Sequence, residues 1–439
     1  MSSSNQDSVP NLERNEEQDI IENNTVHHQE KELSNRPLGN HNIIDFQYED
    51  EYATSEQYDL FAASVIESLK EDIETIIIDL SSSKEITVGM GGEHAPRLVF
   101  TQDSDDSLSQ QIENVVSEIS SQTTLLQETT THDSSNNDSE NELKSSSSRA
   151  LLIIDSSLSH MEDLNFREEM TEIIFNHSKL QNVKYLSIQD ASYLTSLACS
   201  KISAIVVHLG HQTSHVVAVV DGQVRMDSLR TIENGGMSEQ KLNEELARRL
   251  KLVNEQIPLT QELLDRVKQN LKCCVNHSEK NEQESFQVES CSMAEDTNTS
   301  TCSNTLTLGH EIMYQIMEDL FFSSQHKTSL PQIIADCISY ISDESLDLER
   351  NIIVSGSGCI PLIQNFHERL SSDLRTLLGL EIVIDKNSQA RNLAWIGAST
   401  LTSVPEWVSP FCVTRELFEQ EGSSCICSKS YDVIYSSLF

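Results

Sequence analysis

The stretch Ser203–Gly222, SAIVVHLGHQTSHVVAVVDG, constrains the fold of this chain more than any other feature. It contains two apolar runs rich in β-branched residues, separated by a short polar segment that includes Gly210, and it ends in the turn signal Asp221-Gly222. Two such runs joined by a short turn predict a β-hairpin inside a covered sheet. Most hairpins of this kind serve only the fold, so this one alone does not indicate a function.

A second hairpin pattern lies upstream, at Thr75–Phe100, TIIIDLSSSKEITVGMGGEHAPRLVF. It again contains an apolar run, a polar turn, a second β-like run and glycine-rich punctuation. The pair resembles the two-fold repeated α/β fold of actin, hexokinase and the heat-shock ATPases. In that fold, two hairpin turns face each other across a cleft and hold the phosphates of ATP.

Further segments occur in the order that actin and the actin-related proteins require, and they narrow the resemblance to that family. Glu93–Arg97 (EHAPR) resembles the Gly-Asp-x-Ala-Pro-Arg turn that follows the first hairpin of actin. Residues 150–198 resemble the strand, helix and strand that come next in actin. Ile352–Leu362 (IIVSGSGCIPL) resembles the late glycine loop, and Leu393–Leu401 (LAWIGASTL) the start of a late helix. Each motif is weak by itself, but the ordered set covers well over half of the chain.

The resemblance predicts an α/β, two-lobed actin/hexokinase/heat-shock ATPase-like fold with a reduced first outer subdomain and a disordered N-terminal tail. The tail, residues 1–50, is too polar and acidic to offset the entropy of ordering by burying apolar area. The actin-like domain, 51–439, divides into the first phosphate-loop hairpin (73–100), a low-complexity remnant of the outer subdomain (101–149), a core lobe with the second hairpin (150–235), a second outer subdomain (236–306) with a disordered insertion (276–306), and the C-terminal core (307–439).

Composition limits the classes of partner. The chain has 439 residues, 30 of them basic and 70 acidic, which gives a net charge of −40. So strong a negative charge repels nucleic acid and anionic membranes, so we expect no direct nucleic-acid contact and a basic protein partner instead. Ten cysteines without metal-ligand spacing predict reduced intracellular thiols. No apolar run approaches the roughly 20 residues that span a bilayer, so we expect no membrane insertion.

The first turn keeps one of the two chemical parts that the family uses to hold magnesium nucleotide. Phosphate oxygens need several converging backbone N–H groups, which glycines make possible, and Mg²⁺ needs hard oxygen ligands such as carboxylates. The chain has Asp79, but Ser81, Ser82 and Ser83 stand where the family has glycines. Serine hydroxyls can donate to a phosphate, yet the glycine nest is missing.

The second turn departs further from the family. Only Gly210 remains, while His208 and His211 occupy the two acidic positions and Gln212 the last glycine. A mostly neutral imidazole cannot replace a carboxylate around Mg²⁺. We therefore predict no metal site.

Three further positions match the family's nucleotide site. Lys268 matches the lysine on the adenosine side, although Gln269 replaces the glutamate after it, and Gly356 lies in the late loop Ser-Gly-Ser-Gly. Gln189 matches the glutamine that orients the attacking water, and it is the one remnant of a catalytic residue. Without the metal scaffold, one amide leaves the developing charge on the γ-phosphate unstabilised. Two readings stay open: structurally bound ATP or ADP, or a cleft filled by side chains.

The sequence thus predicts a pseudo-ATPase, an actin-related structural subunit of a multiprotein assembly in the cytoplasm and cytoskeleton. The shortened interval 101–149, the altered turns, and EDLFF followed by Leu330–Arg350 and IIVSGSGCIPL resemble the pointed-end actin-related proteins of dynactin. Its partners would be other actin-related proteins and pointed-end subunits. The alternative is an actin-related subunit of a nuclear chromatin-remodelling complex. An active ATPase of the sugar-kinase or chaperone kind is disfavoured by the missing acidic residues.

Overall fold

The computed structural model describes residues 73–82, 84–101, 110, 114–115, 149–157, 165–232, 237–255, 257–274, 286–289, 305–323, 328–341, 346–356 and 358–429. All of them belong to one compact unit that runs from Ser55 to Phe439. The expected tail 1–50 lies outside the described residues, as do most of the interval 101–149 and most of the insertion 276–306. Within that insertion, the strand β9 (Phe286–Glu289) pairs with β10 (Thr305–Leu308), which the sequence did not predict.

One sheet contains the first predicted hairpin and has the strand order β13-β5-β4-β1-β2-β3. Its strands are β1 (Glu74–Asp79), β2 (Glu85–Met90), β3 (Leu98–Thr101), β4 (Arg149–Asp155), β5 (Val183–Asp190) and β13 (Val413–Thr414). The strands β1, β4 and β5 are parallel, whereas β1, β2 and β3 form an antiparallel meander. The parallel strands read as nearly continuous apolar runs because a parallel sheet is covered on both faces.

A second sheet contains the Ser203–Gly222 hairpin and has the order β12-β11-β6-β7-β8. Its strands are β6 (Ala204–Leu209), β7 (Ser214–Val220), β8 (Gln223–Thr231), β11 (Ile352–Ser355) and β12 (Ile384–Asp385). The predicted hairpin is confirmed as the antiparallel pair β6–β7. The turn after β7 is also confirmed, since Asp221 and Gly222 both have positive φ, 51° and 78°, as a two-residue hairpin turn of the I′ kind requires.

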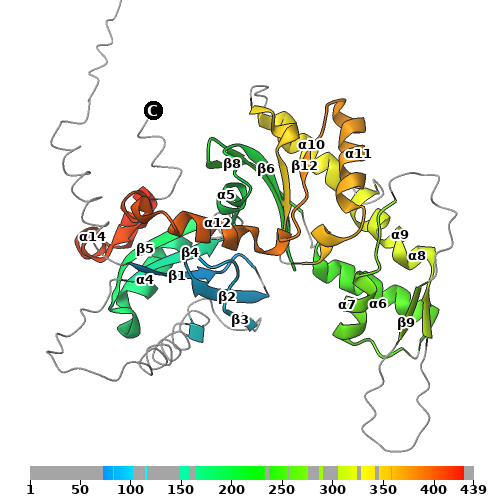
Figure 1. Ribbon diagram of the computed structural model, residues 1–439, viewed down its shortest axis with the longest axis horizontal. Coiled ribbons are helices and arrows are strands. Elements are labelled where there is room, and N and C mark those ends of the chain that lie inside the picture. The colour runs from blue at the N-terminus through cyan, green and yellow to red at the C-terminus, as the bar shows by residue number, and fades with distance from the viewer. Residues whose placement is uncertain are drawn as a thin grey trace, which may run out of the picture. The chain divides into compact units, whose positions relative to one another are not determined.

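Two helices join the sheets through a shared core. Figure 1 shows α5 (Ala191–Ala198) and α12 (Leu393–Thr402) lying between the sheet of β1, β4 and β5 and the sheet of β6 and β8. One buried cluster accordingly combines side chains from both sheets with Leu194 of α5 and Ala398 of α12. Because Gly397 has no side chain, α12 approaches α5 so closely that a Cβ there would lie 1.9 Å from the Leu194 carbonyl oxygen.

The other helices cover the outer faces. They are α4 (Phe166–Asn176), α6 (Glu239–Val253), α7 (Gln261–Lys268), α8 (His310–Met313), α9 (Gln315–Met317), the π-helix η4 (Glu318–Phe322), α10 (Leu330–Ile341), α11 (Phe366–Leu378), α13 (Val408–Phe411) and α14 (Arg415–Glu421). Short 3₁₀ turns include η1 (Ser178–Leu180), η7 (Ile360–Leu362) and η8 (Ala390–Asn392).

Two helix predictions differ from the structure in their continuity. The apolar stretch 311–322 predicts one helix, but the structure divides it into α8, α9 and the π-helix. The stretch 361–378 also predicts one helix, but a 3₁₀ turn precedes α11 and the chain reverses at Asn365, whose φ is 65°. As a result Leu362, expected on the buried face, is 47% exposed.

Candidate functional site

The ends of β1, β6 and β11 surround a cavity of about 320 Å³, which we call the inner cavity. The predicted residues Asp79, Ser81, Ser82 and Gly356 all line it, together with His208. Its remaining lining residues are Glu85, Thr87, Pro96, Val99, Thr195, Ser355, Ala390, Arg391, Asn392, Leu393, Ala394 and Trp395. The two-hairpin pattern therefore brings its chemically relevant residues to one place. Ser83 lies outside the described residues.

The first turn is held by its own polar groups. The Ser81 amide donates to Asp79 Oδ1 at 2.8 Å, and the Lys84 amide donates to Ser82 Oγ at 3.3 Å. Burial raises the pKa of Asp79, and the hydrogen bonds from Ser81 oppose that shift. The carboxyl thus faces the inner cavity with part of its acceptor capacity already used by the turn.

The second turn is closed by Gly210. Its amide donates to the Thr213 carbonyl at 3.1 Å, and a Cβ at this position would lie 2.4 Å from that same oxygen. Glycine is thus required by the tightness of the turn, because any side chain would collide with backbone. Although the sequence assigned Gly210 to phosphate binding, its place in the structure also has this purely conformational reason.

His208 and His215 stack across β6 and β7. They are opposite each other in the strand register, and their ring centroids are 5.1 Å apart. Burial lowers the pKa of His208 to about 4, and burial together with the neighbouring His208 lowers the pKa of His215 well below its ordinary value. Both imidazoles are neutral at physiological pH, so neither supplies the anionic oxygen that Mg²⁺ prefers.

Because Gly356 has no side chain, the backbone just after β11 can approach the backbone at the end of β6 closely. The φ of Gly356 is 152°, and a Cβ there would lie 2.0 Å from the Leu209 carbonyl oxygen. Only glycine fits so close an approach of two backbones. The same approach brings Ser355, the last residue of β11, beside His208, which is its register partner on β6.

Lys268 lines a larger neighbouring cavity of about 660 Å³, which we call the outer cavity. Its ammonium group forms ion pairs with Glu239 at 2.8 Å and with Asp265 at 2.7 Å, and only 4% of its side chain is exposed. Burial would raise the pKa of Glu239, but the hydrogen bond and charge of Lys268 hold it below its usual range. The lysine predicted to contact nucleotide is therefore engaged by two carboxylates of the chain itself.

Glu239 also ties the second turn to the outer helices. It is the first residue of α6, and its amide donates to the Gly210 carbonyl at 3.1 Å. Its other carboxylate oxygen lies 3.5 Å from His211 Nδ1. His211, which stands at the second acidic position of the family's turn, thus contacts a carboxylate on the neighbouring helix.

Gln189 is not among the residues that line either cavity. It is 2% exposed, and its side-chain amide donates to Ser187 Oγ at 2.9 Å on the same strand. In this arrangement the amide of the predicted water-orienting residue is engaged within β5.

Sequence reasoning missed three lining residues. Arg391 lines both cavities and donates through Nε to the Gly358 carbonyl at 3.1 Å. Trp395, 1% exposed, donates through Nε1 to the Glu93 carbonyl and forms part of the inner wall. Ser355 was part of the recognised loop but received no role. The position of Arg391 just before the LAWIG motif was a usable signal, because a segment preceding that helix borders the cleft.

Three general features of the described residues bear on the expectations from the sequence. No group of three or more His, Cys, Asp or Glu side chains is arranged to hold a metal ion in the part of the chain that the structure describes. The eight cysteines in that part are all free thiols. Among the described helices, none combines the length and apolar character needed to cross a bilayer.

The two large sheets each contain one of the two hairpins, and residues of both hairpins line the inner cavity. These features define a two-lobed α/β protein. The actin family profile matches residues 108–304 and 286–431, well over half of the chain. The chain belongs to the actin family, which confirms the predicted two-lobed fold and the resemblance to divergent actin-related proteins.

The curated relatives are distant. Actin-related protein 3 of Schizosaccharomyces pombe is 24% identical over 301 residues, which cover 62% of this chain and 68% of that protein. Human Actin-like protein 9 is 28% identical over 279 residues, covering 60% of this chain and 62% of its own length. Human Actin-like protein 7B is 24% identical over 292 residues, covering 64% and 65%. The matches thus span about two thirds of the relatives' length.

Proposed function

We propose that this chain is a non-catalytic actin-related subunit, which contributes its shape and surfaces to a multiprotein assembly and does not hydrolyse ATP. The observation that carries the proposal is His208, a half-buried and neutral imidazole in the lining of the inner cavity, at the position where the family's second turn offers a carboxylate. The pairing of Lys268 with Glu239 and Asp265 supports it, because a nucleotide would have to compete with both carboxylates.

The chemistry of phosphoryl transfer explains why these changes matter. Hydrolysis requires positive charge around the γ-phosphate, normally from a metal ion and cationic side chains, and an oriented water. The inner cavity offers the acidic groups Asp79 and Glu85, neutral hydroxyl and imidazole groups, and Arg391 as the one cationic side chain among its described lining residues, while Gln189 is hydrogen-bonded to Ser187. These residues do not fit magnesium polyphosphate, so we derive no catalytic step from it.

Two measurements on the purified full chain test this proposal. Denaturing the protein and analysing the released small molecules should yield ATP and ADP far below one equivalent. Incubation with Mg²⁺ and ATP should release phosphate no faster than a buffer blank. Stoichiometric nucleotide that turns over steadily would refute the non-catalytic assignment. A matched variant, His208→Gln, should leave both results unchanged.

We further propose dynactin as the assembly and its pointed end as the position of the subunit. The support comes from the shortened interval 101–149 and from the order of three later segments. EDLFF forms the π-helix, α10 follows it, and the late glycine loop comes after α10. Affinity purification of the full chain at physiological salt should recover other actin-related proteins and pointed-end dynactin subunits. Recovery of chromatin-remodelling subunits instead would reject this placement and favour the nuclear alternative.

A further inference from the structure

Ser355 is a buried polar residue in the wall of the inner cavity whose side chain has no partner within the described fold. It ends β11, is 3% exposed and lines the inner cavity. Its hydroxyl oxygen has no hydrogen-bond partner among the described residues. A buried hydroxyl without a partner costs about 1–3 kcal/mol. Such a group in a cavity wall points to a ligand that supplies the partner.

The rest of the wall is rich in neutral hydrogen-bonding groups. Ser81 and Ser82 of the first turn, Thr87 of β2, Thr195 of α5 and Asn392 all line the cavity. Hydroxyl and amide groups donate and accept, so together they match a molecule that carries several hydroxyl groups. Apolar surface from Pro96, Val99, Leu393 and Trp395 covers other parts of the wall.

The charged groups of the cavity do not favour an anionic ligand. Arg391 is hydrogen-bonded to the Gly358 carbonyl, and Glu85 lines the cavity beside it. Burial raises the pKa of Asp79 and lowers that of His208, so burial favours the uncharged form of both groups, and neither supplies a positive charge for a phosphate. A volume of about 320 Å³ is at the lower end of typical ligand pockets, roughly 300–1,000 Å³.

We propose that the inner cavity binds a small uncharged molecule with several hydroxyl groups, without a metal ion, and that the Ser355 hydroxyl is its buried hydrogen-bond partner. The class includes nucleosides and simple sugars, which share this chemistry. The inference rests on the proposed function in one respect: both hold that the cleft does not bind magnesium polyphosphate.

Binding of two named probes tests the proposal. Adenosine and glucose are titrated separately into the full chain in the presence of EDTA, with saturation-transfer NMR and calorimetry as readouts. At least one probe should bind the wild type, and Ser355→Ala should weaken it about tenfold, the effect of losing one hydrogen bond worth about 1.4 kcal/mol. Ser371→Ala is the matched control, because Ser371 is also a buried serine but lies on α11 and donates to the Ile382 carbonyl.

The ligand-free protein provides a second readout. Ser355→Ala should unfold at the same temperature as the wild type or a higher one, because the hydroxyl has no partner to lose. Lower stability of this variant, equal binding by it, or failure of both probes to bind would overturn the inference. Failure of both probes leaves the non-catalytic function intact. Magnesium-dependent binding and turnover of ATP, run as a separate arm, would instead refute that function.

Discussion

The stacked imidazoles of His208 and His215 make the stability of the second hairpin depend on pH. An unfolded histidine takes up a proton near pH 6.5, whereas folded His208 does so only at about pH 4. The unfolded state therefore binds more protons between these values, and the free energy of unfolding must decrease as the pH falls through that window. His215, whose pKa is also lowered, acts in the same direction.

We expect His208→Gln to flatten this dependence, because its amide does not titrate. Urea unfolding at a series of pH values from 7 to 4 measures the slope for the variant and the wild type. His94→Gln, a change at an exposed histidine, is the control and should keep the wild-type slope. An unchanged slope in His208→Gln would show that His208 is protonated in the folded protein well above pH 4.

Lys268 stabilises the outer cavity through its two carboxylate partners. Lys268→Met leaves Glu239, whose side chain is 12% exposed, without its cation and should lower the free energy of unfolding by about 2–4 kcal/mol. Adding Glu239→Gln should recover part of that loss, because the uncompensated charge that then remains is only that of Asp265, whose side chain is half exposed. Urea unfolding of the single and double variants checks both statements. A double variant as unstable as the sum of the single changes would argue against the ion pair.

Residue types alone revealed part of this site. Asp79, the serines and Gly356 could be assigned from the ordered motifs, and the structure gathers Asp79, Ser81, Ser82 and Gly356 around one cavity. The ion pair of Lys268 with Glu239 could not, because Glu239 lies 29 residues earlier in the chain. Such a contact depends on how α6 and α7 pack, and a single sequence contains no signal for that distance.

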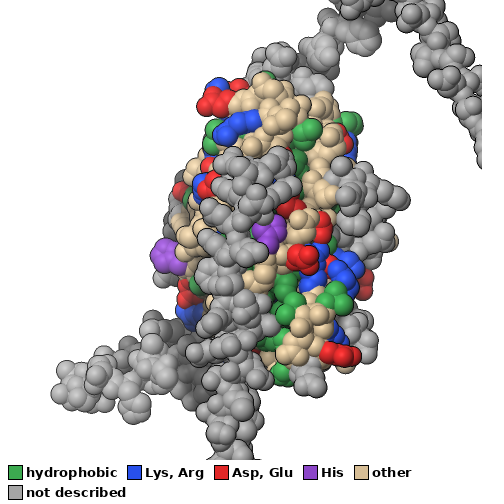
Figure 2. Space-filling model, turned by 90° about the vertical axis from the view of Figure 1, so that its right-hand side faces the viewer, with side chains coloured by type: hydrophobic (Ala, Val, Ile, Leu, Met, Phe, Trp, Pro, Cys, Tyr) green, Lys and Arg blue, Asp and Glu red, His purple; other side chains and the backbone are tan. Residues whose placement is uncertain are grey.

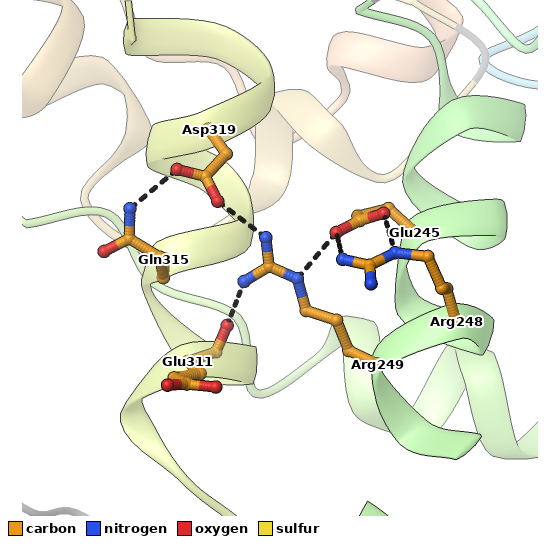
Figure 3. Close-up of polar contacts among 6 residues, drawn as sticks. All are labelled: Glu245, Arg248, Arg249, Glu311, Gln315 and Asp319. Atoms are coloured by element: carbon orange, nitrogen blue, oxygen red, sulfur yellow. Dashed lines mark hydrogen bonds and ion pairs between the residues drawn. The ribbon is translucent and has the colours of Figure 1, made fainter. Parts of the chain in front are cut away.

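Helix α6 is coupled to the π-helix by one arginine, shown in Figure 3. Arg249 donates to Glu245 on its own helix at 2.7 Å, to the Glu311 carbonyl at 2.5 Å and to Asp319 at 2.6 Å. Gln315 holds the second oxygen of Asp319 at 2.7 Å. Arg248, by contrast, contacts only Glu245 in the figure and is 59% exposed.

This contrast gives a prediction with a built-in control. Arg249→Met should lower the free energy of unfolding by about 2–3 kcal/mol, because three hydrogen bonds of a half-buried cation are lost. Arg248→Met should change it by less than about 0.5 kcal/mol, as exposed ion pairs do. A double-mutant cycle of Arg249 with Asp319→Asn should give a coupling of about 1–2 kcal/mol. A coupling near zero would contradict the contact.

The packing of α5 on α12 depends on Gly397. Gly397→Ala places a methyl group 1.9 Å from the Leu194 carbonyl oxygen, so the helices must separate. We expect a loss of about 3 kcal/mol or more, the range of overpacked cores, measured by thermal and urea unfolding. Gly309→Ala is the control, since no atom lies within 4 Å of a Cβ there. Equal, small effects of both changes would show that the helices are not in close contact.

Periodicity was a good guide to where helices exist and a poor guide to their continuity. The apolar spacing of 311–322 predicts an uninterrupted helix, and the break arises from tertiary contacts. The adjacent acids Glu318 and Asp319 bind arginines from different helices, Arg369 and Arg249 respectively. The π-helix accommodates both contacts, and nothing in the local pattern indicates them.

At the scale of the whole molecule, the sequence predicted strands in both sheets because each hairpin shows two apolar runs joined by a short polar turn. The net charge of −40 predicted an acidic molecule, yet the face in Figure 2 carries acidic and basic side chains interspersed. Among the described residues, basic and acidic side chains also pair directly at the surface, as Arg350 and Glu381 do. Composition therefore determines the net charge of the molecule, but it does not determine how acidic and basic side chains are arranged on the surface that a partner would contact.

Arg415, near the C-terminal end of the described residues, connects α14 to α4 and the segment after it, more than 200 residues earlier in the chain. This first residue of α14 donates to the carbonyls of Phe175 at 2.7 Å, Leu180 at 2.9 Å and Val183 at 3.1 Å, and its guanidinium lies over the Phe175 ring. Phe175 is in the last turn of α4, where helix carbonyls lack partners within the helix.

Loss of this arginine should therefore release α14 before the sheets unfold. We expect Arg415→Met to lower the free energy of unfolding by about 2–4 kcal/mol, since several charge-assisted hydrogen bonds disappear together. We also expect faster proteolytic cleavage near residues 412–421, measured by limited proteolysis and mass spectrometry of the fragments. Arg350→Met, which removes an exposed ion pair with Glu381, is the control and should match the wild type in both assays. Cleavage of Arg415→Met at the wild-type rate would mean that the apolar contacts of Leu417 and Phe418 suffice to hold the helix against α4.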